Sequence, residues 1–427
     1  MRYFKLSENE TTLKTEALAG LTTFLTMSYI IFVNPSILKE TGMPANAALV
    51  ATVLVAALSS VLMGVIANLP YALAPGMGIN AFFTYTLVIT QGISWQVALG
   101  ATFISGIIFI LLTILNVRTL IVIAIPKVLR FSIAAGIGLF IAFIGLKNAG
   151  VIVSHPATLV THGKWSPSVI IFFISLAITI FLVVHKFKIA LLVGILVGTL
   201  LGIVSGNISL PETIIVAPDF SLFGQFAIKE ALTLSMVAPI FSMLMTDLFD
   251  SIATFLGVAQ AANLLDDEEQ PKNISKALFV DAIATTGAGI FGSSAGTTYI
   301  ESVSGIESGG RTGLTAVVTG ILFLPFLFLG NLATVVPSYA TAPALVIVGI
   351  FMCGQLRYID FENYEDAIPA FLAIILIPLT YSITQGIVWS FISYTTLKIT
   401  LGKSDELHPM MYVITLLSGL IIFIEYS

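Results

Sequence analysis

Charged residues are scarce in this sequence. Only 10% of its 427 residues are Asp, Glu, Lys or Arg, whereas 57% are hydrophobic, and the mean hydropathy is +1.03. Soluble domains carry about 25% charged residues, so this composition excludes an aqueous globular protein. A bilayer core of roughly 30 Å requires about 20 apolar residues per helix. We therefore predict an all-α membrane protein that crosses the bilayer many times.

The sequence also lacks a basic cluster and a second cysteine. Its 18 Lys and Arg residues are scattered and its net charge is -5, which excludes a nucleic-acid partner. Cys353 stands alone, so neither an internal disulfide nor a Cys-based metal site can form. The 4 histidines lie in predicted loops or at the ends of apolar runs, too far apart for a metal site. We predict no metal and no cofactor.

Long apolar runs divide the chain into two halves around a polar stretch at 205–225. The first half contains runs at 17–38, 46–67, 71–90, 95–116, 131–153, 168–184 and 189–206. The second half contains runs at 230–258, 275–292, 297–307, 312–330, 339–354, 366–382, 384–402 and 408–425. The second half has one run too many for symmetry. One of the last three is expected to be short, re-entrant or half of a bent helix, which gives about fourteen spans.

The basic residues predict the orientation. Residues 1–16 are polar and lack the apolar core of a signal peptide, so the N-terminus is expected in the cytoplasm. With this start, Lys39, Lys147, Lys164 and Lys229 fall outside. The side on which the basic residues near 400 lie depends on the number of spans at the C-terminal end, which is unassigned. All the other Lys and Arg residues fall on the cytoplasmic side, as the positive-inside rule expects. An odd number of spans per half predicts an inverted repeat, as in many secondary transporters.

Two apolar runs are interrupted by small and polar residues at corresponding places. The third run contains ALAPGMGIN at 72–80, and the third run of the second half contains SAGTTYIE at 294–301. Pro and Gly also produce ordinary kinks in membrane helices. However, a broken backbone at membrane depth normally lines protein or a cavity, and a half-helix offers free N–H donors. The paired breaks favour a substrate site, with Asn80 in one and Glu301 in the other.

Few acidic residues lie within the apolar runs. A carboxylate at bilayer depth costs roughly 2.5–3.5 kcal/mol, so it normally faces a partner or a wet cavity. Asp247 and Asp250 are three residues apart, which predicts nearly one helix face and a shared site where one of them could carry a proton. The alternative is a packing pair bonded to Ser or Thr hydroxyls. Asp281 is expected either to relay protons or to anchor its helix.

Several sequence blocks then resemble a known family. They are GLTTFLTMSYIIFVNP from Gly20, APGMGINAFF from Ala74, TDLFDSIATFLGVA from Thr246, TTYIESVSGIESGGRTGLTAVVTG from Thr297, TAPALVIVG from Thr341 and IPAFLAIILIPLTYSITQGI from Ile368. In order and extent these blocks resemble AzgA-like purine nucleobase permeases, the adenine/guanine/hypoxanthine transporters of the nucleobase transporter superfamily.

The resemblance implies an architecture. It implies a 7+7 inverted repeat of core and gate bundles, with a short strand plus half-helix in spans 3 and 10. The implied segments are a core bundle at 1–116 and 228–330 and a gate bundle at 117–210 and 331–427.

The resemblance also implies site residues. Asp247 and Glu301 would hydrogen-bond a purine, Asn80 and Gly78 would line its site, Thr298 and Tyr299 would border it, and Asp250 would assist binding or coupling. Phe249 or Phe82 could stack on the purine. Uracil-type relatives carry a His on the eighth span, whereas the TDLFD motif here has none, which favours the purine branch.

The predicted function is therefore import of hypoxanthine, guanine or adenine across the cell membrane by proton symport and alternating access. Asp250 and Asp281 are the predicted coupling residues, and a homodimer is a candidate assembly. The alternative, an anion exchanger or channel on the same fold, would require a cation near the breaks, and the sequence has none there. A membrane enzyme would require a nucleophile with a base, or a metal set, and neither is visible.

Overall fold

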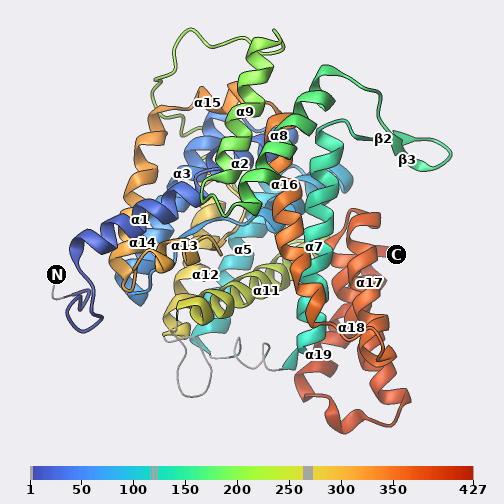
Figure 1. Cartoon of the computed structure of the whole chain (residues 1–427). Coiled ribbons are helices and arrows are strands. Elements are labelled where there is room, and N and C mark those ends of the chain that lie inside the picture. Colours follow the sequence, from blue (N-terminus) through green and yellow to red (C-terminus); the bar gives the residue numbers. More distant parts are fainter. Residues whose placement is uncertain (1–2, 116, 118–120, 122–123, 263–272, 427) are drawn as a thin grey trace.

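The computed structural model describes residues 3–115, 117, 121, 124–262 and 273–426 (Figure 1). The first half contains α1 (Leu13–Met27), α2 (Ile30–Leu38), η1 (Lys39–Thr41), α3 (Ala45–Leu62), η2 (Met63–Ala67), β1 (Leu73–Pro75), α4 (Met77–Ala81), η3 (Phe82–Thr90), α5 (Trp95–Ile114), α7 (Lys127–Asn148), β2 (Ile152–His155), β3 (Leu159–His162), α8 (Pro167–Val184) and α9 (Ala190–Val204). Elements labelled η are 3-10 or π-helical.

The second half is also mostly helical. It contains α10 (Ile228–Ala231), η4 (Leu234–Met236), α11 (Val237–Ala262), α12 (Ile274–Phe291), β4 (Gly296–Thr298), α13 (Ser302–Glu307), α14 (Gly313–Phe323), η5 (Leu324–Phe328), α15 (Leu332–Val335), α16 (Ser338–Cys353), η6 (Gly354–Tyr358), α17 (Tyr364–Thr380), α18 (Ile383–Thr400), η7 (Ser404–Glu406) and α19 (Pro409–Tyr426).

The apolar runs explain these helices. Within the described residues, 7 helices are long and apolar enough to cross a membrane, and shorter apolar helices accompany them. Polar residues mark several helix starts, as at α8, where the Ser166 hydroxyl accepts from the Val169 N–H at 3.3 Å and Pro167 opens the helix. The last three runs form three separate helices, α17, α18 and α19. The count of fourteen spans stays a prediction.

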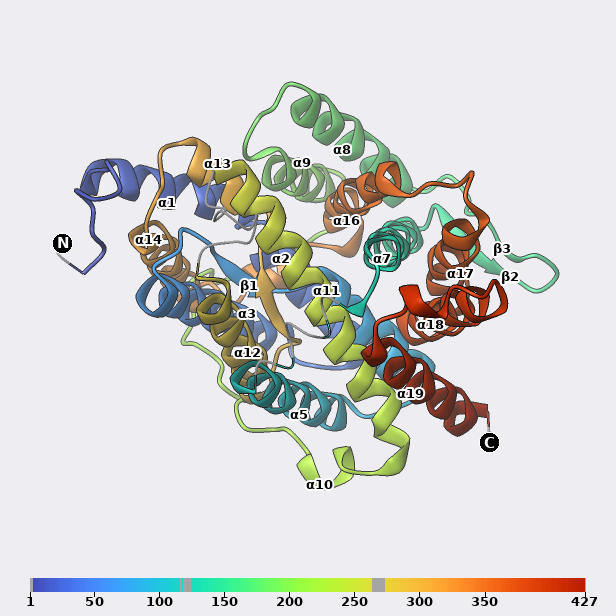
Figure 2. The ribbon, with the colours of Figure 1, turned by 90° about the horizontal axis from the view of Figure 1, so that it is seen from below.

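The helices fall into two groups by their contacts. In the first group, α1 and α3 pack against α14, and α5 packs against α12. In the second group, α7 packs against α16 and α17, α8 against α9, and α17 against α18. Figure 2 shows the two groups on either side of α11, which contacts members of both.

Close backbone approach holds the second group together. A Cβ atom placed on Gly349 of α16 would lie only 2.5 Å from the Gly138 carbonyl oxygen of α7. Small residues allow membrane helices to approach this closely, since lipid provides no hydrophobic force between them. The α7–α16 pair therefore depends on these two glycines.

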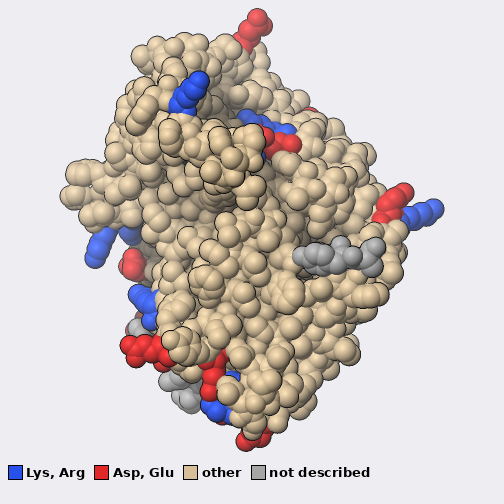
Figure 3. All heavy atoms as spheres, turned by 90° about the vertical axis from the view of Figure 1, so that its right-hand side faces the viewer, with Lys and Arg blue, Asp and Glu red and all other residues tan. Residues whose placement is uncertain are grey.

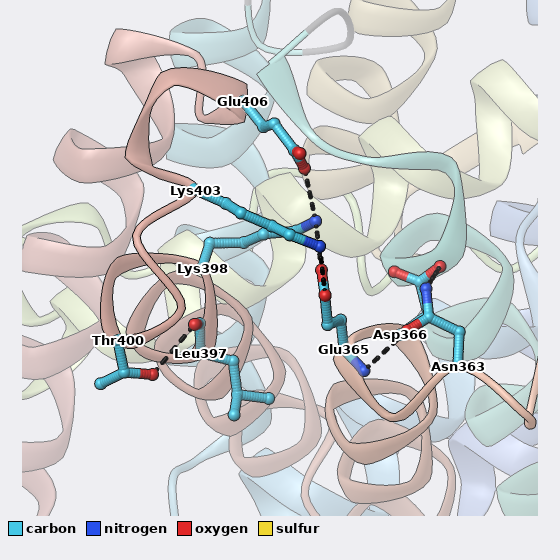
Figure 4. Close-up of polar contacts among 8 residues, drawn as sticks. All are labelled: Asn363, Glu365, Asp366, Leu397, Lys398, Thr400, Lys403 and Glu406. Atoms are coloured by element: carbon cyan, nitrogen blue, oxygen red, sulfur yellow. Dashed lines mark hydrogen bonds and ion pairs between the residues drawn. The ribbon is translucent and has the colours of Figure 1, made fainter.

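An ion-pair cluster joins the ends of α17 and α18. The buried Lys398 amine lies 2.8 Å from a Glu365 oxygen and 2.6 Å from a Glu406 oxygen, and Lys403 pairs with the other Glu365 oxygen. Figure 4 shows both lysines reaching toward Glu365 from the α18 side. Because Glu365 lies in the first turn of α17, the cluster closes this end of the α17–α18 pair.

One face of the molecule has a broad surface free of charged side chains. Figure 3 shows Lys, Arg, Asp and Glu mainly around the margins of this view, with uncharged residues across its middle. Large apolar side chains are exposed on the outer helices, including Phe181 of α8 and Leu416 and Phe423 of α19. Such a surface suits contact with lipid.

Candidate substrate site

Two short strands meet where the sequence has its two breaks. β1 and β4 pair antiparallel, with Leu73 opposite Thr298 and Pro75 opposite Gly296. The pairing extends beyond the strands, because the Gly76 N–H donates to the Ala295 carbonyl at 2.9 Å. Each strand leads toward a short helix, α4 after β1 and α13 after β4. The backbone groups that leave the helical ladder are thus bonded to each other, as membrane depth requires.

A cavity of about 170 Å³ adjoins the paired strands. Tyr29 comes from the break between α1 and α2. The two strand breaks and α11 contribute Gly76, Met77, Gly78, Asp250, Thr254, Thr297, Thr298, Tyr299, Ile300 and Glu301. The second group of helices contributes Ala134, Val348, Phe351, Met352 and Gln355. The lining residues that the structure describes include two carboxylates and no Lys or Arg. Because both helix groups supply lining residues, a movement of one against the other would change the shape of the cavity.

Glu301 faces the cavity at the N-cap position of α13. Its carboxylate oxygen Oε1 accepts a hydrogen bond from the Tyr29 hydroxyl at 2.6 Å. Tyr29 lies between α1 and α2, where the first long helix is interrupted. This hydrogen bond therefore joins the break between α1 and α2 to the start of α13, through two residues that are 272 positions apart in sequence.

Tyr299 and Thr298 also reach the cavity, from the end of β4. The Tyr299 hydroxyl donates to the Pro75 carbonyl oxygen at 2.6 Å and so fixes its ring against β1. In contrast, the buried Thr298 hydroxyl has no hydrogen-bond partner within the described part of the chain. An unpartnered buried hydroxyl is costly, so a ligand that bonds to it would gain affinity.

Asp250 and the glycines of the first break line the same cavity. A Cβ atom on Gly76 would lie 2.5 Å from the Thr297 methyl group and 3.5 Å from Asp250 Oδ2. A Cβ atom on Gly78 would lie 2.7 Å from the Ile137 side chain of α7. Glycine at both positions keeps β4, α7 and the cavity close to the first break.

Asp247 and Asp250 have different surroundings, although we predicted a shared site. Three residues on an α-helix turn by about 300°, which leaves the side chains about 60° apart. Asp250 faces the cavity, whereas the buried Asp247 accepts from the Thr285 hydroxyl of α12 at 2.6 Å. This angle allows Asp247 to bond to α12 while Asp250 lines the cavity.

A hydroxyl network links Asp247 to the buried Asp281. The Ser251 hydroxyl lies 2.6 Å from Asp281 Oδ2, 3.4 Å from Asp247 Oδ1 and 3.1 Å from Thr297 Oγ1. The Thr285 hydroxyl also lies 3.2 Å from the Gly296 carbonyl oxygen. Only Thr297 in this network lines the cavity. The network joins α11 and α12 to β4.

Asn80 and Phe249, both predicted to contact a substrate, do not line the cavity. Asn80 is buried in α4, and its Oδ1 atom accepts from the Ser294 hydroxyl, which ties α4 to the residues before β4. Phe249 packs edge to face against Phe391 of α18, with ring centroids 6.3 Å apart. Phe82 is also buried outside the lining. The aromatic residues that do line the cavity are Tyr29, Tyr299 and Phe351.

Several lining residues were missed in the sequence. Thr254 follows Asp250 by four residues, so helical spacing could have placed it on the same face. Tyr29 lies in the block TMSYIIFVNP, but no local pattern there marks a helix interruption. Phe351 and Gln355 lie at the end of an unremarkable apolar run. Their part in the cavity comes from the packing of α16 and η6, which no sequence motif reveals.

The arrangement suits binding of an uncharged polar molecule. Two carboxylates and a free hydroxyl accept or donate hydrogen bonds, and aromatic rings offer flat apolar surfaces. Within the described residues, no group of three or more His, Cys, Asp or Glu could hold a metal ion.

Comparisons with known proteins give a consistent result. Residues 14–389 match the family Xan_ur_permease, described as the Permease family. The chain is 44% identical over 427 residues to the adenine permease AdeP of Escherichia coli, covering 99% of this chain and 96% of AdeP. It is 38% identical over 436 residues to the guanine/hypoxanthine permease PbuO of Bacillus subtilis, covering 99% of this chain and 100% of PbuO.

A solved structure shares the fold. The transmembrane domain of the cyanobacterial bicarbonate transporter BicA superposes with a TM-score of 0.67 at 18% sequence identity, covering 88% of this chain and 97% of that one. The predicted mostly helical, multi-pass membrane architecture is therefore confirmed.

Proposed function

Because this chain belongs to the permease family, whose members are transporters rather than enzymes, we propose that it carries purine nucleobases through the cavity between its two helix groups. The permeases that it resembles over nearly its whole length transport adenine, guanine or hypoxanthine, according to their names. The observation that carries the proposal is the pair of cavity carboxylates, Asp250 and Glu301, with no cation among the lining residues that the structure describes. This lining disfavours the alternative, an anion exchanger or channel.

The purine would bind between Asp250 and Glu301. A purine edge has N–H donors and ring-nitrogen acceptors, which two carboxylates and the Thr298 hydroxyl can match. Tyr299 and Phe351 would contact its faces, and Gly76 and Gly78 would allow its close approach. The proposal moves direct contact from Asp247 to Asp250, since Asp247 bonds to Thr285 outside the cavity lining. Asn80 and Phe249 would shape the site from behind its lining.

Transport would be driven by protons. Asp250 and Glu301 are the cavity carboxylates, and Asp281 lies beyond Ser251 and Thr297. Intramembrane carboxylates commonly mark proton paths. Proton symport through Asp250, with Asp281 as the second coupling residue, is the proposed mechanism.

The remaining features of the proposal concern the membrane. The chain would lie in the cell membrane with its N-terminus in the cytoplasm and fourteen spans in a 7+7 inverted repeat. The core bundle at 1–116 and 228–330 would move against the gate bundle at 117–210 and 331–427, by alternating access. A homodimer is the candidate assembly.

The test is uptake of labelled hypoxanthine, guanine and adenine into vesicles that contain the purified protein, with and without an inward proton gradient. We expect uptake of at least one purine, stimulated by the gradient. Loss of a hydrogen bond to a charged group costs about 1.5–3 kcal/mol, so Asp250→Asn and Glu301→Gln should each reduce uptake at low substrate by about tenfold or more.

Two controls make this test decisive. Empty vesicles define background uptake, and Glu362→Gln removes an exposed carboxylate that does not line the cavity, without an expected effect on uptake. Absence of purine uptake in the unmodified protein would overturn the proposed function. Uptake that follows a sodium gradient alone would overturn proton coupling while leaving the substrate class intact.

A further inference from the structure

Tyr29 occupies an unusual position beside the cavity. It lies between α1 and α2, and its side chain is fully buried. Its hydroxyl group reaches Glu301 Oε1 at 2.6 Å, across the space between the first long helix and the start of α13. The β1–β4 pairing does not supply this contact. That pairing brings together Tyr299 and Pro75, whose side-chain hydroxyl and carbonyl oxygen form a separate hydrogen bond.

The Glu301 carboxylate has few neighbours that can hold it. Within the described residues, the Tyr29 hydroxyl is the one side-chain donor bonded to it. Tyr299 lies nearby but donates its hydroxyl to the Pro75 carbonyl oxygen. A glutamate side chain has three rotatable bonds, and ordering such a side chain costs up to about 2 kcal/mol of conformational entropy. Without the Tyr29 hydroxyl, the carboxylate would lose this side-chain donor and could take other orientations around the cavity.

We propose that Tyr29 is a positioning residue, which holds the Glu301 carboxylate in the orientation that binds the substrate. The proposal deepens the proposed function and rests on it for the identity of the substrate. The Tyr29 hydroxyl has one proton to donate, and a carboxylate offers about four lone-pair sites. Glu301 can therefore keep the Tyr29 bond and still accept from a ligand N–H.

Tyr29→Phe removes only the hydroxyl group and keeps the ring that fills the buried space. Uptake should show about a tenfold higher KM, equivalent to about 1.4 kcal/mol, with a maximal rate within about twofold of the unmodified protein. The matched control is Tyr71→Phe. Tyr71 is equally buried, its hydroxyl has no partner among the described residues, and it does not line the cavity.

A second measurement reports on Glu301 without any purine. Infrared spectra of the purified full-length protein contain a carboxyl band of Glu301, which subtraction of the Glu301→Gln spectrum identifies. Loss of a hydrogen-bond donor changes the frequency of a carboxyl stretching vibration. We expect this band to shift in Tyr29→Phe and to stay in place in Tyr71→Phe.

The outcomes separate the two proposals. If the unmodified protein takes up no purine, the proposed function fails and the infrared band alone decides the role of Tyr29. If uptake is present but Tyr29→Phe has an unchanged KM and an unshifted band, the positioning role is overturned and the proposed function stands. A Tyr29→Phe protein that fails to fold would also overturn it, because a positioning role predicts normal folding.

Discussion

Two threonines of the second half show how single hydroxyl groups can serve stability or binding. Thr285 lies in α12 and Thr298 is the last residue of β4, and both are buried. The Thr285 hydroxyl bonds to Asp247, whereas the buried Thr298 hydroxyl has no partner in the described part of the chain, and Thr298 lines the cavity. The same isosteric change to valine should therefore have opposite effects at these positions.

Thr285→Val should lower the thermal stability of the detergent-solubilised protein, because Asp247 loses a donor and such a loss costs about 1–3 kcal/mol. Thr298→Val should leave the melting temperature unchanged or slightly higher, and should raise the KM for uptake. Melting curves and uptake kinetics of both variants test this pair. Equal melting temperatures for the two variants would contradict the assignment of Thr285 to the structure and of Thr298 to the cavity.

At the scale of elements, the α17–α18 pair depends on charges at one end. Lys398 bridges Glu365 and Glu406 and is buried, whereas the Lys403 side chain is 42% exposed and, among the described residues, pairs with Glu365 alone. An exposed ion pair contributes little because water screens it, whereas removing one partner of a buried pair leaves the other unpaired. The two lysines should therefore differ in their effect on stability.

Lys398→Met should lower the melting temperature more than Lys403→Met, since it removes two ion pairs and a buried charge. Both variants should retain the substrate KM, because none of the four charged residues lines the cavity. Thermal unfolding followed by size-exclusion chromatography measures the difference. A larger effect of Lys403→Met would show that Glu365 depends mainly on the exposed partner.

At the scale of the whole molecule, η3 of the first half contacts the second helix group at the end of α7 and just after α17. The Asn148 side chain at the end of α7 donates to the Tyr85 hydroxyl of η3 at 2.8 Å, and the Lys147 amine lies 5.2 Å from the centre of the same ring. The Thr86 hydroxyl donates to the Tyr381 carbonyl oxygen at 2.6 Å. Under the proposed orientation this end is extracellular, so these contacts would close the outer side of the cavity.

Asn148→Ala should therefore favour the outward-open state. A neutral hydrogen bond contributes about 0.5–1.5 kcal/mol, which corresponds to a population shift of about two- to tenfold. Replacement of the single cysteine, Cys353→Ser, permits a Thr298→Cys reporter in the cavity. A membrane-impermeant maleimide added to intact cells should label this reporter faster in the Asn148→Ala background.

The matched control is Asn207→Ala. The exposed Asn207 side chain donates to the Ser205 hydroxyl at 2.9 Å, and both residues lie in the segment 117–210 of the proposed gate bundle. This change should not alter the labelling rate, because the contact does not join the two bundles. Equal labelling of the Asn207→Ala and Asn148→Ala proteins would contradict an outer closure at Tyr85.

The sequence by itself determined the membrane class, the helical runs and the two breaks. Hydropathy and the local effects of Pro75, Gly76 and Gly296 are sufficient for this, because they act within a few neighbouring residues. Packing decided the rest. That β1 pairs with β4, that Asp247 turns to Thr285 while Asp250 faces the cavity, and that Tyr29 reaches Glu301 all depend on contacts between distant segments. Local spacing gives the angle between side chains on one helix, whereas the neighbouring helices decide what each side chain contacts.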